Sequence, residues 1–108
     1  MLMLHGRNAG PGNILELASQ FPHPDFTYLA PAAAESTWYP YSFLAETESN
    51  EPWLSSALEL VETIVRDVEA RGVPRRRIVL LGFSQGACLA SEFLVRHAGR
   101  FGGLVALS

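Results

Sequence analysis

The segment Leu80-Leu81-Gly82-Phe83-Ser84-Gln85-Gly86-Ala87-Cys88 decides how the rest of this sequence is interpreted. The apolar run at 78–81 predicts a buried strand, and residues 85–97 predict a helix directly after the turn. A Gly-x-Ser-x-Gly turn between a strand and a helix is the pattern of a nucleophile elbow. Its glycines let the two elements cross without a clash of Cβ atoms, and its serine has a strained backbone and a projecting hydroxyl. We therefore predict that Ser84 is a catalytic nucleophile.

The residues beside this serine have predicted roles of their own. The backbone N–H of Gln85 would point at the oxygen that becomes negatively charged when a nucleophile attacks a carbonyl group. Cys88 lies one helical turn after Ser84. We expect it to be a small core residue, because nothing near it in the sequence would activate its thiol.

The composition is that of one soluble globular domain. The chain has 108 residues, of which 48% are hydrophobic and 18% are charged. A net charge of −3 argues against a nucleic-acid partner, which would require a basic face. The eight Lys and Arg residues are all arginines, so a Schiff-base lysine and a P-loop lysine are excluded.

Cysteine usage and hydropathy predict a cytoplasmic protein. A single cysteine excludes an intrachain disulfide and is typical of a reducing compartment. No apolar run approaches the length of a membrane-spanning helix, and the N-terminus lacks the basic-then-apolar order of a signal peptide. We therefore expect no integral membrane segment. The sequence makes no prediction about the oligomeric state.

Strands and helices alternate along the chain, which predicts an α/β fold with a parallel sheet of about four strands and helices on both faces. The expected strands are 2–5, 26–30, 77–82 and 103–107, and the expected helices are 14–19 (capped by Asn13), 52–71 and 85–97. Strand 26–30 should lie outside 2–5, followed by 77–82 and then 103–107. A ligand would bind at the carboxyl ends of the strands.

Two connections carry features of binding sites. Residues 5–12 form a glycine-rich loop after the first strand. Residues 31–50 form a long connection without periodicity, and it contains an aromatic cluster at 38–44. Loops of this length in small domains are usually functional, so the cluster predicts a pocket wall or a lid.

Five motifs together resemble the phospholipase/carboxylesterase family, the branch of the α/β hydrolases that includes carboxylesterases and acyl-protein thioesterases. In chain order they are His5–Ala9, Pro31–Ala32, Trp38–Pro40, Gly82–Cys88 and Gly103–Ser108. The resemblance runs from about Leu2 to Ser108 in the order and spacing of the family.

The resemblance implies a set of site residues, namely Ser84 as nucleophile, the backbone N–H groups of Gln85 and Arg7 as oxyanion hole, and Trp38, Tyr39 and Gly6 around the substrate. Many relatives have a second glycine where this chain has Asn8. Asparagine tolerates a positive φ better than most residues, so the loop can keep its shape.

The acid and the base of a catalytic triad are missing after Ser84. The chain offers only Glu92 and His97 there, both on the helix that begins at the turn. His97 would lie roughly 20 Å away along that helix, too far to be the base. His5 is expected to anchor its loop, and His23 to lie on the surface. By the resemblance, we therefore expect the chain to be a single partial domain, 1–108, lacking N-terminal strands and the C-terminal part that would carry the triad Asp and His.

Three functions remain open at this point. The first is a serine hydrolase that cleaves small-molecule acyl esters or thioesters through an acyl-enzyme on Ser84, without a metal or organic cofactor. The second is a non-catalytic module that binds an acyl or lipid ligand. The third is a half-enzyme completed by another chain. The reading frame after Ser108 would separate them.

Overall fold

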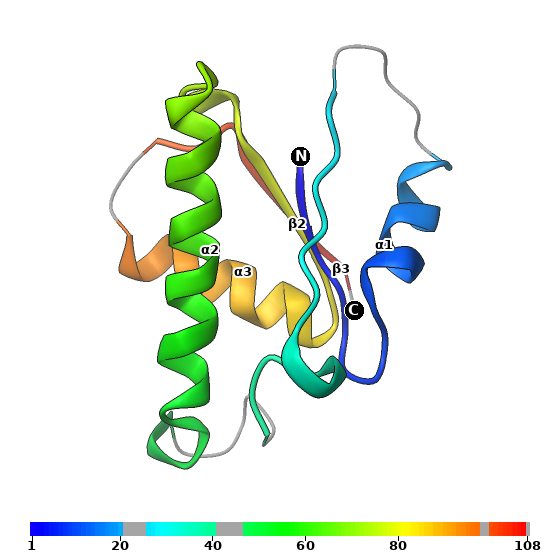
Figure 1. Cartoon of the computed structure of the whole chain (residues 1–108), viewed down its shortest axis with the longest axis vertical. Coiled ribbons are helices and arrows are strands. Elements are labelled where there is room, and N and C mark those ends of the chain that lie inside the picture. Colours follow the sequence, from blue (N-terminus) through cyan, green and yellow to red (C-terminus); the bar gives the residue numbers. More distant parts are fainter. Residues whose placement is uncertain (21–25, 41–46, 98–99, 108) are drawn as a thin grey trace.

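A three-stranded parallel sheet forms the centre of the computed structural model, which describes residues 1–20, 26–40, 47–97 and 100–107 (Figure 1). The strands are β1 (Leu2–Leu4), β2 (Val79–Phe83) and β3 (Gly103–Leu107), in the order β1-β2-β3. The register pairs Leu4 with Gly82 and Phe83 with Leu107. These three strands are those predicted, in the predicted order.

The strand expected at 26–30 is reduced to one parallel bridge between Leu29 and Leu2. The Leu29 N–H donates to the Met1 carbonyl at 2.9 Å, and the Met3 N–H donates to the Leu29 carbonyl at 2.8 Å. The segment lies on the predicted side of β1, but the described sheet has three strands and not about four. Pairing stays short because β1 has three residues and because Pro31 has no N–H to donate.

Three helices cover the sheet: α1 (Pro11–Ala18), α2 (Trp53–Ala70) and α3 (Gln85–Arg96). Short 3₁₀ turns lie at Ala34–Ser36, Thr47–Asn50 and Arg75–Arg77. The start predicted for α1 was wrong, because the helix begins at Pro11, a residue that favours the first helical position. Asn13 lies inside the first turn, where its side-chain oxygen accepts a hydrogen bond from the Gly10 N–H at 3.0 Å.

The helices lie on both faces of the sheet, as expected (Figure 1). On the α1 side the buried cluster is Met3, Ile14, Ala18 and Leu81. The larger cluster lies on the side of α2 and α3 and consists of Leu2, Leu4, Trp38, Tyr39, Leu54, Ala57, Leu58, Val61, Val65, Ile78, Leu80, Leu89, Ala90 and Phe93. No helix among the described residues is both long and apolar enough to cross a membrane.

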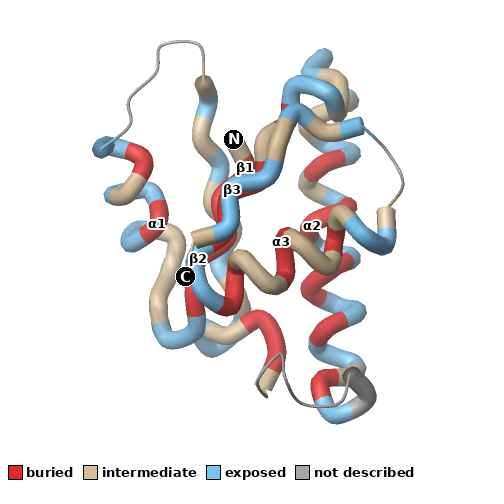
Figure 2. Tube along the Cα trace, turned by 180° about the vertical axis from the view of Figure 1, so that it is seen from behind, coloured by how far each residue is buried: buried red, intermediate tan, exposed pale blue. Residues whose placement is uncertain are grey.

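β3 is exposed along most of its length (Figure 2). In the described part of the chain it pairs only with β2, so its other edge is open. Leu104 is 40% exposed and Val105 is 38% exposed. An open edge that carries apolar side chains favours pairing with a second molecule.

We predict that the 108-residue chain on its own self-associates through β3. Val105→Lys should shift the chain toward the monomer, because a charged side chain at an open edge opposes strand pairing. Size-exclusion chromatography with light scattering across a range of concentrations measures this. Val95→Lys is the control, because Val95 is also an exposed valine (82%) but lies on α3. Elution of the unaltered chain as a monomer at all concentrations would contradict the prediction.

Candidate active site

Ser84 connects the end of β2 to the first residue of α3 and is exposed to solvent. Its backbone has φ 54° and ψ −113°, a conformation that residues other than glycine rarely adopt. The Ser84 N–H donates to the Leu107 carbonyl at 2.7 Å, and the Ser84 carbonyl accepts from the Ala87 N–H at 3.0 Å. The strained serine expected from the motif is therefore present and held from both sides.

Gly82 and Gly86 allow α3 to cross the sheet at backbone contact. A Cβ on Gly86 would lie 2.0 Å from the Leu4 carbonyl oxygen, and a Cβ on Gly82 would lie 2.2 Å from the Gly86 carbonyl oxygen. Real Cβ atoms essentially never approach closer than 3.0 Å. Both positions therefore require glycine for lack of space, as the motif predicts.

The turn after β1 lies directly against Ser84. A Cβ on Gly6 would be 3.5 Å from the Ser84 Cβ and 3.2 Å from the Phe83 carbonyl oxygen. Arg7 follows Gly6 in this turn. Asn8 has φ 63°, the positive value that asparagine was expected to tolerate, and its N–H donates to the Ser36 carbonyl at 2.8 Å. The structure thus brings Gly6 and Ser84 together, and Arg7 is the next residue in the same turn.

The His5 ring anchors this turn. It is 1% exposed; its Nδ1 lies 2.7 Å from the Gly6 carbonyl oxygen, and its Nε2 accepts from the Ala33 N–H at 3.1 Å. These contacts assign the proton to Nδ1. Because both ring nitrogens are used in these contacts, His5 has the anchoring role that was expected of it.

Trp38 and Tyr39 lie in the interior, where they are 4% and 2% exposed. Burial, together with the nearby Cys88 thiol, raises the pKa of Tyr39 to about 12, so this phenol is no base at neutral pH. A role for Trp38, Tyr39 and Gly6 in contacting substrate stays a prediction. Residues 41–46, which include the rest of the aromatic cluster, lie outside the described residues.

Gln85 has a side-chain arrangement that the sequence motif does not reveal. Its backbone N–H occupies the first position of α3, where a helix provides no internal acceptor. Its side chain is buried and hydrogen-bonded to Trp38 and Tyr39. The only signal in the sequence is a polar residue at the start of a mostly apolar helix.

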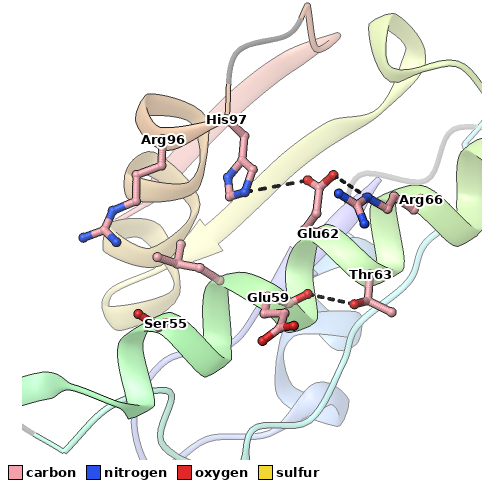
Figure 3. A pocket seen from close by; sticks show the side chains of 8 residues that line it. Ser55, Glu59, Glu62, Thr63, Arg66, Arg96 and His97 are labelled. Carbon is pink, nitrogen blue, oxygen red and sulfur yellow. Dashed lines mark hydrogen bonds and ion pairs between the residues drawn. The ribbon is translucent and has the colours of Figure 1, made fainter.

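His97 lies at the opposite end of α3 from Ser84, in a different environment (Figure 3). Its Nε2 is 4.0 Å from the Glu62 Oε2, and its ring stacks on Phe93. His97 borders a cavity of about 430 Å³ between α2 and α3. The residues that line this cavity are Ser55, Leu58, Glu59, Glu62, Thr63, Arg66, Arg96 and His97. His97 is thus committed to the helix interface, and His23 lies outside the described residues.

Two further kinds of reactive group could contribute to chemistry, a free cysteine and a cluster of metal ligands. Cys88 is partly exposed and free of a disulfide, and is less buried than the core residue expected. Within residues 1–20, 26–40, 47–97 and 100–107, no three His, Cys, Asp or Glu side chains gather where they could hold a metal ion.

The chain is similar to known hydrolases. A family model described as phospholipase/carboxylesterase matches residues 1–108. Acyl-protein thioesterase 1 homolog 1 of Dictyostelium discoideum is 32% identical over 75 residues, which are 67% of this chain and 33% of that protein.

Solved structures show the same arrangement of elements. A phospholipase/carboxylesterase from Dyadobacter fermentans is 42% identical, with a TM-score of 0.95 over 99% of this chain and 51% of that one. SOBER1 of Arabidopsis thaliana, 20% identical with a TM-score of 0.79 over 95% of this chain and 57% of that one, shows the fold alone. The chain therefore spans about half the length of these solved relatives.

We predict that Gly86→Ala destabilises the fold by about 3 kcal/mol or more, because the new methyl group would overlap the Leu4 carbonyl and force α3 away from β1. Urea unfolding measures the change. Gly12→Ala is the matched control: it lies in α1 with nothing within 4 Å of the added Cβ, so it should be neutral or stabilising by up to about 1 kcal/mol. Equal stability of the two variants would contradict the close crossing.

Glu62 generates a pH-dependent prediction. Burial alone would raise the pKa of its carboxyl group, but hydrogen bonds from Arg75 (2.5 Å) and Arg66 (3.0 Å), with the charge of His97, outweigh burial and hold the pKa below its ordinary value. A lowered folded-state pKa means that the ionised form stabilises the fold at neutral pH. This contribution should disappear as the pH falls below about 4.3 and through the folded pKa.

Glu62→Gln should therefore lower the free energy of unfolding by about 1–2 kcal/mol at pH 7, and the difference from the unaltered protein should vanish in acid. Urea unfolding at a series of pH values measures it. Glu59→Gln, which changes an exposed carboxylate on the same helix, should have little effect. If Glu62→Gln lowers the free energy of unfolding by the same amount at pH 3 and pH 7, the charge of Glu62 is not the cause.

Proposed function

Because this chain belongs to the phospholipase/carboxylesterase family, we propose that it forms the nucleophile-bearing part of a serine hydrolase that cleaves acyl esters or thioesters. The observation that carries the proposal is the strained, exposed Ser84 beside the Gly6 turn at the carboxyl ends of β1 and β2. A reactive serine at this edge of a parallel sheet matches where ligands bind in such folds.

In this mechanism the Ser84 Oγ attacks the acyl carbonyl carbon and transfers its proton to a general base. The carbonyl oxygen takes up the negative charge, and the N–H groups of Gln85 and Arg7 donate hydrogen bonds to it. Collapse of the tetrahedral intermediate breaks the bond to the alcohol or thiol, which leaves with a proton from the base. Water then attacks the acyl-enzyme by the same route and releases the carboxylic acid.

The general base in this proposal lies outside the described residues. His5 uses both ring nitrogens in its loop, and His97 is at the far end of α3. A histidine and an acidic residue supplied by another part of the protein would complete the triad, whose order in such folds is Ser, then Asp or Glu, then His. The thioester option is suggested by the name of the Dictyostelium relative, and the ester option by the name of the Dyadobacter relative.

We predict that a protein extended through the sequence encoded after Ser108 hydrolyses p-nitrophenyl butyrate and reacts with a fluorophosphonate probe. Ser84→Ala should lower its kcat by about 10³-fold or more, because the other triad members do little without the nucleophile. The 108-residue chain alone should hydrolyse the ester close to the background rate.

Cys88→Ala in the extended protein is the control, because it removes the other nucleophile near the turn and should leave most of the activity. Equal turnover by the unaltered protein and Ser84→Ala would show that Ser84 is not the nucleophile. Strong fluorophosphonate labelling of Ser84 in the 108-residue chain would show instead that this chain activates its own serine.

A further inference from the structure

Two backbone N–H donors on separate turns must be aligned if the proposed function is correct. One belongs to Gln85 at the start of α3, and the other to Arg7 in the turn after β1. The ladder between β1 and β2 ends at the pair Leu4 and Gly82, before either turn begins. Hydrogen bonds of the sheet therefore do not hold the turns together, and other contacts must do so.

The Gln85 side chain reaches from α3 to a segment that we call the brace, Thr37–Tyr39. Its Oε1 accepts from the Trp38 N–H at 2.9 Å, and its Nε2 donates to the Tyr39 carbonyl at 2.9 Å. The Thr37 hydroxyl lies 3.2 Å from the same amide. Gln85 is 8% exposed, so both ends of its amide are satisfied within the protein and shielded from water.

The other side of the brace contacts the turn after β1. The Trp38 Nε1 donates to the His5 carbonyl at 2.8 Å, and the indole stacks on the His5 ring with centroids 4.8 Å apart. The Arg7 guanidinium donates to the Tyr39 carbonyl at 3.2 Å, the same oxygen that accepts from Gln85. The brace is therefore hydrogen-bonded to both turns at once.

We propose that the Gln85 side chain is a positioning residue that locks the brace against α3 and thereby holds the Arg7 turn in line with Ser84. The side chain acts through the brace and does not touch the substrate; the inference rests on the proposed function. Oxyanion donors must be placed within a fraction of an ångström, because their benefit is realised only at the position of the developing charge. Loss of the lock should therefore weaken binding of the transition state more than binding of the substrate.

Gln85→Met in the extended, active protein tests the inference, because methionine has a similar length but no amide. We expect kcat to fall about 10- to 100-fold while KM changes less than about threefold. The inhibition constant of a trifluoromethyl ketone, which forms a tetrahedral adduct, should rise in parallel with the fall in kcat/KM. Ser91→Ala is the control, because its hydroxyl donates to the Ala87 carbonyl within the same helix.

Gln85→Glu provides a second readout that a general loss of stability would not produce. As a carboxylate, Glu would still accept from the Trp38 N–H but would repel the Tyr39 carbonyl oxygen. As a neutral acid it would regain a donor and imitate the amide. A carboxyl group at this buried position should have a pKa raised well above its ordinary value, so the activity of Gln85→Glu relative to the unaltered protein should recover about tenfold between pH 8 and pH 5.

The outcomes separate the two proposals. If Ser84→Ala remains fully active, the proposed function is wrong, whatever Gln85 does. If Ser84→Ala is inactive but folded Gln85→Met keeps kcat within threefold of the unaltered protein, only the positioning role is wrong. If Gln85→Met does not fold, the pH series of Gln85→Glu decides, and a constant activity ratio from pH 5 to pH 8 overturns the inference.

Discussion

The backbone contact between α3 and the end of β1 is the constraint on which the rest of the structure depends. Gly86 lies so close to the Leu4 carbonyl that no side chain fits between them. Gly82 lies similarly close to the Gly86 carbonyl and leaves no room for a side chain either. A helix that starts this close to a sheet can follow its strand only through a sharp turn. The residue at that turn, Ser84, therefore takes a positive φ, and its strain is held by hydrogen bonds to Leu107 and Ala87.

The same contact explains why distant parts of the chain meet at the serine. Because α3 is seated on the end of β1, the turn that follows β1 passes beside Ser84, and a Cβ on Gly6 would already be in tight contact, 3.2 Å from the Phe83 carbonyl oxygen. His5 and the brace, Thr37–Tyr39, then close around this turn from the other side. The proposed oxyanion hole is thus a product of packing between backbones, and side chains such as Gln85 adjust it from outside.

Much of the fold could be predicted because its signals are local. The apolar strand, the glycine spacing and the helix around Ser84 follow from steric rules over a few residues, and the motifs identified the family that the comparisons show. The strand at 26–30 could not be judged locally, because its pairing is limited by the length of β1. The Gln85 amide likewise bonds to Trp38 and Tyr39, which lie 47 and 46 positions earlier in the chain, so its role depends on tertiary structure. The catalytic roles themselves stay predictions.

The two ends of α3 have opposite electrostatic environments, and this arrangement fits the proposed chemistry. The N-terminal end carries N–H groups without helical acceptors beside Ser84, so the helix dipole favours a negative charge there, such as that on a tetrahedral intermediate. At the C-terminal end Arg96 pairs with Glu92 at 2.6 Å, and the His97 ring stacks on Phe93. The His97 Nε2 also lies 4.0 Å from the Glu62 Oε2, which links this end of the helix to α2. Gly86 and the Gln85 side chain hold the other end against β1 and the brace, so the position of the Gln85 N–H beside Ser84 depends on how the helix is seated.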